Sequence, residues 1–224
     1  MQKINILGMS LTDYSLREAI GITDRFIGSG SLNTILFISA KILVEAGNSE
    51  KQRAWIGAAD LIVWSDAEIV RQAGISAKER THEVENQDYL KEVLKRLGRG
   101  KKPIYLLAES EEELEQLENN LKYIREDLNI VGKDAVSGVR AEWDDEANRI
   151  NELAPAAVIS GMRFERQAEL VESMKKILNA DIWLALDHEM QPGNRKMPFI
   201  RKILSKWYHY LFQKLLLEYH HKDR

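Results

Sequence analysis

The chain has 224 residues, of which 44% are hydrophobic and 30% are charged, and it contains no cysteine. This composition is typical of a globular protein with a substantial core, and the lack of cysteine excludes disulfides, thiolate metal sites and cysteine nucleophiles. The net charge of -3 predicts no general affinity for nucleic acid.

Short apolar runs alternate with longer segments of helical period along the chain. Strands are expected at residues 4–7, 34–38, 61–64, 104–107, 129–131, 156–159 and 182–186, and helices at residues 15–27, 41–46, 50–58, 67–73, 89–97, 111–125, 146–153 and 165–178. This alternation predicts an α/β fold with an open, mostly parallel sheet and helices on both of its faces. In such sheets, ligands bind outside the carboxyl ends of the strands.

The N-terminus reads as a strand and lacks the apolar region of a signal peptide. No run approaches the roughly 18 apolar residues that a membrane-spanning helix needs. We therefore expect a cytoplasmic protein that does not cross a membrane.

The stretch DLIVWSDAEIV, residues 60–70, places Asp66 where an expected strand meets an expected helix. Two interpretations are open. A carboxylate at a helix start accepts backbone N–H bonds and complements the helix dipole, so Asp66 would be a cap. Alternatively, it lies on the ligand-binding rim of the sheet and removes a proton from an attacking hydroxyl as a general base.

The stretch ISGMRFERQAEL, residues 159–170, is a second candidate site. Gly161 permits a tight turn after a strand, and Arg163, Arg166 and Gln167 follow at the start of a helix, where backbone donors favour an anion such as a phosphate. An ordinary turn with solvated arginines is the alternative.

Other polar clusters are weaker candidates. Asp187, His188 and Glu189 follow the last strand, but alternating residues face opposite ways and no second histidine has ligand spacing, so no metal site is expected. His82 is expected in a loop.

The C-terminal segment from Pro198 predicts a long amphipathic helix. Its apolar stripe is expected to comprise Phe199, Ile203, Trp207, Leu211 and Leu215, and its polar face Arg201, Lys202, Ser205, Lys206, His209, Gln213 and Lys214. From Arg195 onward, eight basic and two acidic residues give a net charge of +6, which leaves -9 for the rest of the chain. Such a helix either lies on an anionic membrane surface or packs on the domain or a neighbouring subunit.

Proline, glycine and asparagine cluster at residues 190–198, before this helix. A cluster of this kind is typical of a boundary between structural units. The expected division is therefore a domain at residues 1–192 and a basic appendage at residues 193–224.

The order and spacing of several segments carry a resemblance to a known family. These segments are INILGMSL with SLREAI, AADLIVWSDAEIV, PIYLLAES, LNIVG, AAVISGMRFERQAEL and NRKMPFIRKILSKWYHYLFQ. Along nearly the whole chain, this order resembles the WecG/TagA/CpsF family of bacterial glycosyltransferases, which implies a Rossmann-like domain.

The resemblance assigns roles to particular residues. The family's Pro-Asp-Gly motif, with a proposed catalytic base, corresponds to Ser65-Asp66-Ala67. The residues that would bind the nucleotide sugar are Ser39, Asp88, Gly161, Arg163, Arg166 and Gln167, and those that would meet a diphosphate or anionic lipid are Arg195, Lys196, Arg201, Lys202 and Lys206. Ala108-Glu109 stands where the family has Gly-Gly, and Phe37 and Ser39 stand at the Thr and Asn positions of a Thr-Pro-Asn motif.

The function that the resemblance implies is transfer of an N-acetylhexosamine, typically N-acetylmannosamine, from its UDP form to a lipid-linked sugar. The transfer would need no metal or other cofactor and would invert the anomeric centre. The protein would form homo-oligomers at the inner face of the cell membrane. Because glycines at the site are replaced, a second interpretation is a catalytically impaired relative that serves as a binding or scaffolding module in envelope biogenesis.

Overall fold

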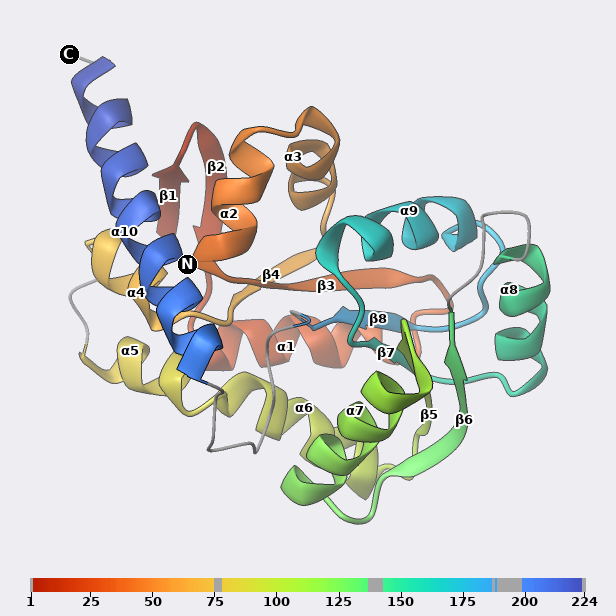
Figure 1. Ribbon diagram of the computed structural model, residues 1–224. Helices are drawn as coiled ribbons and strands as arrows, with labels where there is room; N and C mark the ends of the chain where they lie inside the picture. The colour runs from red at the N-terminus through yellow and green to blue at the C-terminus, as the bar shows by residue number, and fades with distance from the viewer. Residues whose placement is uncertain (1, 75–77, 137–142, 187, 189–198, 223–224) are drawn as a thin grey trace.

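The computed structural model describes residues 2–74, 78–136, 143–186, 188 and 199–222, with the side chains of residues 199–205 and 218–222 left out. Six parallel strands form one sheet in the order β4-β3-β8-β7-β5-β6 (Figure 1). The strands are β3 (Asn33–Ile38), β4 (Leu61–Trp64), β5 (Pro103–Ala108), β6 (Asn129–Ala135), β7 (Ala157–Ser160) and β8 (Ile182–Ala185). The predicted α/β fold is confirmed.

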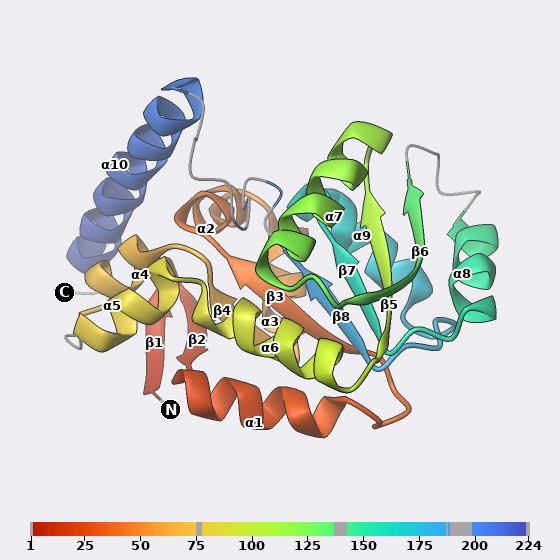
Figure 2. The ribbon, with the colours of Figure 1, turned by 90° about the horizontal axis from the view of Figure 1, so that it is seen from below.

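Helices cover both faces of the sheet (Figures 1 and 2). One apolar cluster joins the sheet to α1 (Leu16–Phe26), α6 (Asp88–Arg99) and α7 (Glu111–Ile124). The other joins it to α2 (Ala40–Gly47), α3 (Glu50–Gly57), α4 (Ala67–Gln72), α5 (Lys78–Glu85), α8 (Trp143–Glu152), α9 (Phe164–Met174) and α10 (Phe199–Lys222). Because each connection is helical, all six strands point the same way.

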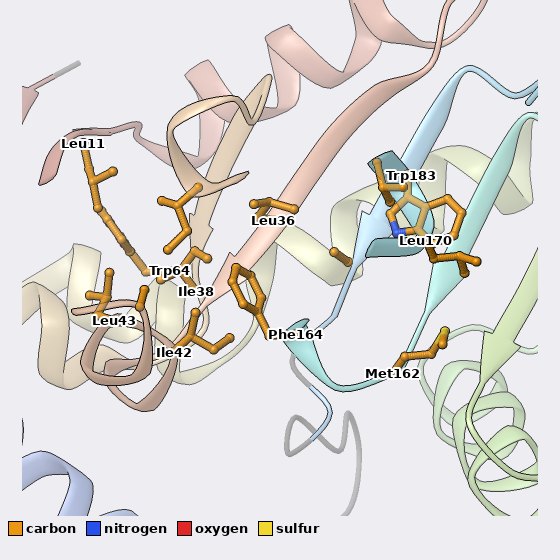
Figure 3. Close-up of a cluster of buried hydrophobic side chains, with 14 of the residues drawn as sticks. Leu11, Leu36, Ile38, Ile42, Leu43, Trp64, Met162, Phe164, Leu170 and Trp183 are labelled. Carbon is orange, nitrogen blue, oxygen red and sulfur yellow. The ribbon is translucent and has the colours of Figure 1, made fainter. Parts of the chain in front are cut away.

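The central strands are buried on both sides, which explains their continuous apolar sequence. In β3, Leu36 and Ile38 enter one cluster, whereas Ile35 and Phe37 enter the other. Figure 3 shows Leu36 and Ile38 on the same side as Trp64 and several other labelled side chains. Strands that need apolar residues at every position read as short unbroken runs, and β3, β4, β5, β7 and β8 were predicted from that signal. The strand β6 is half-buried or exposed throughout, and only its first three residues were predicted.

The expected first strand forms part of a separate hairpin. β1 (Gln2–Ile6) pairs with β2 (Met9–Asp13) in an antiparallel two-stranded sheet. The turn residues Leu7 and Gly8 both have positive φ, 50° and 76°, as the tight hairpin turn requires. Leu7 therefore lies in a turn and not in a strand, and β2, with exposed residues in alternation, was not predicted.

Asp13, at the end of β2, attaches this hairpin to the rest of the fold. Its Oδ1 accepts hydrogen bonds from Trp64 Nε1 at 2.7 Å and from Arg80 Nη2 at 2.9 Å. Trp64 ends β4, two residues before Asp66. The network therefore supports the strand end that carries the first candidate residue.

The helix α5 contradicts the expectation that His82 lies in a loop. Val84 is its only buried residue, so the segment has no apolar periodicity that a sequence pattern could reveal. Arg80 holds it to the hairpin through Asp13. Tertiary contacts, not a hydrophobic stripe, place this helix.

The helix α10 has 24 residues and is about 36 Å long, so the prediction of a long C-terminal helix is confirmed. Its packed face differs from the predicted stripe, because Phe212 is fully buried whereas Trp207 is 55% exposed. Tyr208, Leu211, Leu215 and Leu216 pack beside Phe212 against the core. The assignment of Trp207 to the buried face was therefore wrong, and the helix is turned so that Tyr208 and Phe212 meet the domain.

The close packing of β6 on β5 gives a stability prediction. A Cβ on Gly132 would lie 2.7 Å from Tyr105 Cδ2 and 2.6 Å from Leu153 Cδ1. Because Tyr105 is buried, Gly132→Ala should lower the free energy of unfolding by about 1–3 kcal/mol in urea titrations. Gly21→Ala in α1 meets nothing within 4 Å and should raise it by up to about 1 kcal/mol. Equal stability of Gly132→Ala and wild type would contradict the packing.

Candidate active site

The candidate residues follow the carboxyl ends of the parallel strands. Ser39 follows β3, Asp66 follows β4 by one residue, Glu109 follows β5 and Gly161 follows β7. Since all of these strands run in the same direction, their ends lie along one edge of the sheet. The expected position of Asp66 at the carboxyl edge of the sheet is therefore observed, and the other three turns lie along the same edge.

Asp66 is the N-cap residue of α4. Its Oδ1 accepts a hydrogen bond from the backbone N–H of Glu68 at 2.9 Å, which confirms the capping interpretation. Its Oδ2 accepts a longer bond from the N–H of Ala40, at 3.4 Å. Ala40 begins α2, so Asp66 joins the turns that follow β4 and β3. Its side chain is 20% exposed, and its use as a base stays a prediction.

His209 of α10 makes the most prominent contact of Asp66. The imidazole Nε2 lies 2.7 Å from Asp66 Oδ2. Burial alone would raise the pKa of the Asp66 carboxyl, but hydrogen bonds from His209 and Glu68 outweigh it and hold this pKa below 3.8. The same bond raises the pKa of the His209 imidazole above 6.5, although burial opposes it. The two groups therefore favour an ionised pair.

Two further contacts attach α10 around this pair. Gln213 Nε2 donates to Glu68 Oε1 at 2.9 Å, and Tyr208 Oη donates to Glu45 Oε1 at 3.2 Å. The acceptors belong to α4 and α2, and Figures 1 and 2 both show α10 beside these helices. The predicted polar face of α10 thus supplies His209 and Gln213 to the domain.

Ser39 and Asp88 occupy helix starts on either side of Asp66 in sequence. Ser39 caps α2, with its Oγ accepting from the N–H of Ile42 at 3.4 Å. Asp88 is the first residue of α6 and lies 3.8 Å from Lys91 Nζ. Within the described residues no hydrogen bond or ion pair joins Asp88 to Asp66. Ser39 directly precedes Ala40, whose N–H is bonded to Asp66, so Ser39 lies close to Asp66. No such link is observed for Asp88 in the described part of the chain.

A second cluster lies at the ends of β5 and β7. Arg163 donates from Nε and Nη2 to Glu109 Oε2, at 2.9 and 2.7 Å, and its backbone N–H donates to Glu109 Oε1 at 2.8 Å. Burial raises the pKa of the Glu109 carboxyl, but Arg163 outweighs this and holds it below 4.5. The guanidinium is 70% exposed, so the pair lies at the surface of the edge.

Gln167 lies beneath this edge and is 1% exposed. Its Nε2 donates to the carbonyls of Met162 and Leu186, at 2.6 and 2.9 Å, and its Oε1 accepts from Trp183 Nε1 at 3.4 Å. These bonds join the turn after β7 to the end of β8. Gln167 thus has a positioning role in this structure, and a direct ligand contact stays a prediction.

Gly161 and Arg166 flank the same turn. A Cβ added at Gly161 would come no closer than 3.4 Å to Leu117, which is ordinary van der Waals contact. The fold itself therefore does not require glycine at this position. Arg166 is half-buried in the first turn of α9.

His188 is the described member of the cluster that follows β8. Its Nδ1 lies 3.1 Å from the carbonyl oxygen of Gly161, and its Nε2 lies 3.7 Å from Glu113 Oε1. Asp187 and Glu189 lie outside the described residues. Among the residues that are described, no three histidine or acidic side chains are grouped closely enough to hold a metal ion.

The basic residues of the appendage are only partly described. Arg195 and Lys196 lie outside the described residues, as does the expected boundary at residues 190–198. Arg201 and Lys202 lie in α10, where only their backbone is described, and Lys206 of the same helix is exposed. Their roles stay predictions.

The fold and the polar edge define a class of protein. A parallel sheet with carboxylate, guanidinium and helix starts at its carboxyl edge is typical of doubly wound α/β proteins that bind nucleotides. The sequence profile described as Glycosyl transferase WecG/TagA/CpsF family matches residues 4–191. The chain belongs to this glycosyltransferase family, and the predicted resemblance is confirmed. No curated protein matches the chain.

The contacts of His209 were not predicted. The sequence places this residue on the polar face of a helix 143 positions after Asp66, and the matched range ends before α10 begins. No short motif joins residues so far apart. The only signal was a histidine, which titrates near neutral pH, on an appendage that was otherwise rich in lysine.

Proposed function

We propose that this protein transfers an N-acetylhexosamine, such as N-acetylmannosamine, from a UDP-sugar to a lipid-linked sugar acceptor in the synthesis of a cell-envelope polysaccharide. The observation that supports this most is the position of Asp66, a partly exposed carboxylate on the ligand-binding edge of a glycosyltransferase-family fold. Its charge drives removal of the acceptor's proton. The reaction proceeds with inversion and without a metal ion.

The donor lies at the β5 and β7 ends of the edge. The start of α9 offers backbone donors, and Arg163 offers a planar guanidinium that is 70% exposed. In this structure, Glu109 is bonded to the guanidinium of Arg163. When the donor binds, its diphosphate replaces Glu109 as the partner of Arg163, and the Glu109 side chain moves away. Arg166 supplies a second cation, and Gly161 leaves room for close approach. Ser39, which follows β3, contacts the sugar from that side. The contact of Asp88 with the sugar is proposed from the family resemblance alone.

The acceptor arrives from a membrane surface, on which α10 lies. Its outward face exposes Trp207 and Tyr210, by 55% and 65%, with Lys206 beside them. Aromatic and cationic side chains on one helix face favour an anionic interface. The role proposed for Arg195, Lys196, Arg201 and Lys202 is contact with a diphosphate or lipid headgroup, and it rests on their charge alone. No described helix is long and apolar enough to span a bilayer.

On this proposal the protein is peripheral to the inner face of the cell membrane and works as a homo-oligomer. A lipid-linked acceptor has a mobile sugar and a fixed lipid end, so a surface-bound enzyme needs only to present its edge to the headgroup layer. The division into a catalytic unit at residues 1–192 and a membrane-facing appendage at residues 193–224 fits this arrangement.

Asp66→Asn tests the role of the carboxylate. Asparagine caps a helix as well as aspartate does, so α4 should persist while the negative charge is lost. We expect kcat for transfer from the UDP-sugar to a lipid-linked acceptor to fall by about 10²- to 10⁴-fold. Asp24→Asn in α1, whose carboxylate pairs with Arg96, is the matched control. Equal turnover of Asp66→Asn and wild type would remove Asp66 from the reaction.

A second candidate function is a binding or scaffolding module that no longer transfers sugar. The ion pair of Glu109 and Arg163 favours this second function. Glu109 stands where the family has glycine, and its carboxylate occupies the guanidinium that a diphosphate would otherwise bind. On this alternative, no nucleotide sugar binds at the edge.

Thermal unfolding with UDP-N-acetylhexosamine separates the two functions. Ligand at 100 times its Kd adds about 2.7 kcal/mol of stability, so the proposed enzyme should show a clear rise in Tm. Arg163→Ala should reduce this rise, whereas Arg53→Ala, which removes an exposed arginine of α3, should not. No rise for the wild type with any nucleotide sugar would favour the scaffolding function.

The membrane contact is tested by vesicle sedimentation. The double variant Lys206→Glu/Trp207→Ser should weaken binding to phosphatidylserine vesicles at least tenfold, since each surface cation contributes about 1 kcal/mol and the reversal changes two charges. The control Lys122→Glu/Tyr123→Ser alters a matching pair on α7, where Tyr123 is 72% exposed. Undiminished binding by the first variant would contradict the contact.

A further inference from the structure

The hydrogen bonds of Asp66 limit what this carboxylate can do by itself. Oδ1 accepts from the N–H of Glu68, and Oδ2 accepts from Ala40 and from His209. A carboxylate that accepts several hydrogen bonds is stabilised as the anion and is a weak base. An acceptor hydroxyl would also have to compete with these three donors. Asp66 is therefore well placed to orient another group and poorly placed to take a proton directly.

His209 has the geometry of a base that a carboxylate orients. Its Nε2 is bonded to Asp66 at 2.7 Å, which fixes the ring and leaves Nδ1 as the second nitrogen. Among the described residues, Nδ1 has no hydrogen-bond partner. The side chain is 31% exposed, so the ring reaches solvent. A carboxylate bonded to one nitrogen of an imidazole, with the second nitrogen facing the substrate hydroxyl, is the arrangement by which a histidine accepts a proton.

The attachment of α10 keeps the ring in place. Gln213, one turn after His209, is bonded to Glu68, and Tyr208, directly before it, is bonded to Glu45. Phe212 is fully buried beside them. These contacts lie on both sides of His209 along the helix, so the imidazole is held by packed neighbours and not only by Asp66.

We propose that His209 is the group that removes the acceptor's proton, and that Asp66 acts through it as a positioning residue. The inference deepens the proposed function and rests on it. The acceptor hydroxyl oxygen attacks the anomeric carbon of the donor sugar and forms the new C–O bond. Its proton passes to Nδ1 of His209. The old C–O bond breaks, and its electron pair leaves with UDP.

The charges around His209 favour this role. From α4, Asp66 and Glu68 face the imidazole and stabilise its protonated form, whereas Arg71 opposes them. From α2, Glu45 and Lys41 meet the neighbouring Tyr208, and they carry opposite charges. Asp66 and Glu68 therefore stabilise the imidazolium that forms when the proton is taken.

The dependence of rate on pH distinguishes His209 from Asp66 as the direct proton acceptor. A base must be unprotonated to act. Asp66 raises the pKa of the His209 imidazole from its ordinary value, so kcat/KM should increase as pH rises through neutrality and then level off. Hydrogen bonds from His209 and Glu68 hold the pKa of the Asp66 carboxyl below its ordinary acidic range, so direct use of Asp66 would give a flat profile across neutral pH.

The test compares transfer by the full chain and by His209→Gln, His209→Ala and His82→Gln between pH 5.5 and 9. We expect kcat of His209→Gln to fall by about 10²- to 10⁴-fold, and its kcat/KM no longer to rise through neutral pH. Added imidazole should restore part of the activity of His209→Ala. His82 is exposed on α5 and contacts Asn86, so His82→Gln should match the wild type. A second readout is the NMR titration of His209, whose pKa should fall in Asp66→Asn.

The outcomes separate this inference from the proposed function. Two results would overturn the role of His209 and leave the glycosyltransferase function standing. In the first, His209→Gln transfers sugar as fast as the wild type. In the second, His209→Gln is slower, but its kcat/KM still rises through neutral pH as that of the wild type does. A wild type that transfers no sugar from any UDP-N-acetylhexosamine would overturn both. An ordinary imidazole pKa for His209, unchanged in Asp66→Asn, would overturn the pairing itself.

Discussion

The Asp66 carboxylate lies where three helices meet, and it accepts a hydrogen bond from each of them, through Glu68 of α4, Ala40 of α2 and His209 of α10. Hydrogen bonds to a charged group contribute about 1.5–3 kcal/mol each when they are shielded from water. Asp66 is therefore one of the residues that attach α10 to the domain, together with Glu68, which accepts from Gln213, and the buried Phe212. A helix cap and a candidate catalytic group are therefore the same residue.

The edge of the sheet divides into two parts with different electrostatics. At the β3 and β4 ends, Asp66 and His209 form a hydrogen-bonded pair. At the β5 and β7 ends, Glu109 and Arg163 form an ion pair that covers the start of α9. The strand β8 separates the two, and Gln167 joins its end to the turn after β7. In the proposed reaction, acceptor activation and donor binding fall on opposite sides of β8.

How far the sequence predicted the fold depended on burial. Strands that are buried on both faces, such as β3 and β7, need an apolar residue at every position, and this pattern is visible locally. The strand β2 alternates buried and exposed residues, and α5 buries only Val84, so neither stands out. For α10, the sequence has more apolar residues than one face can hold. The packing of α10 on the domain determines that Phe212 is buried and Trp207 is exposed.

The sequence by itself determined the α/β fold, the family, and the position of Asp66 between a strand and a helix. These features follow from periodicity and from residues close together in the chain. Only the tertiary structure decided that Asp66 meets His209, that Glu109 holds Arg163, and that Gln167 is buried. The first two join residues that lie 143 and 54 positions apart in the chain, and the third depends on packing around the end of β8. No local pattern specifies such contacts, because they form only when the sheet brings distant strand ends together.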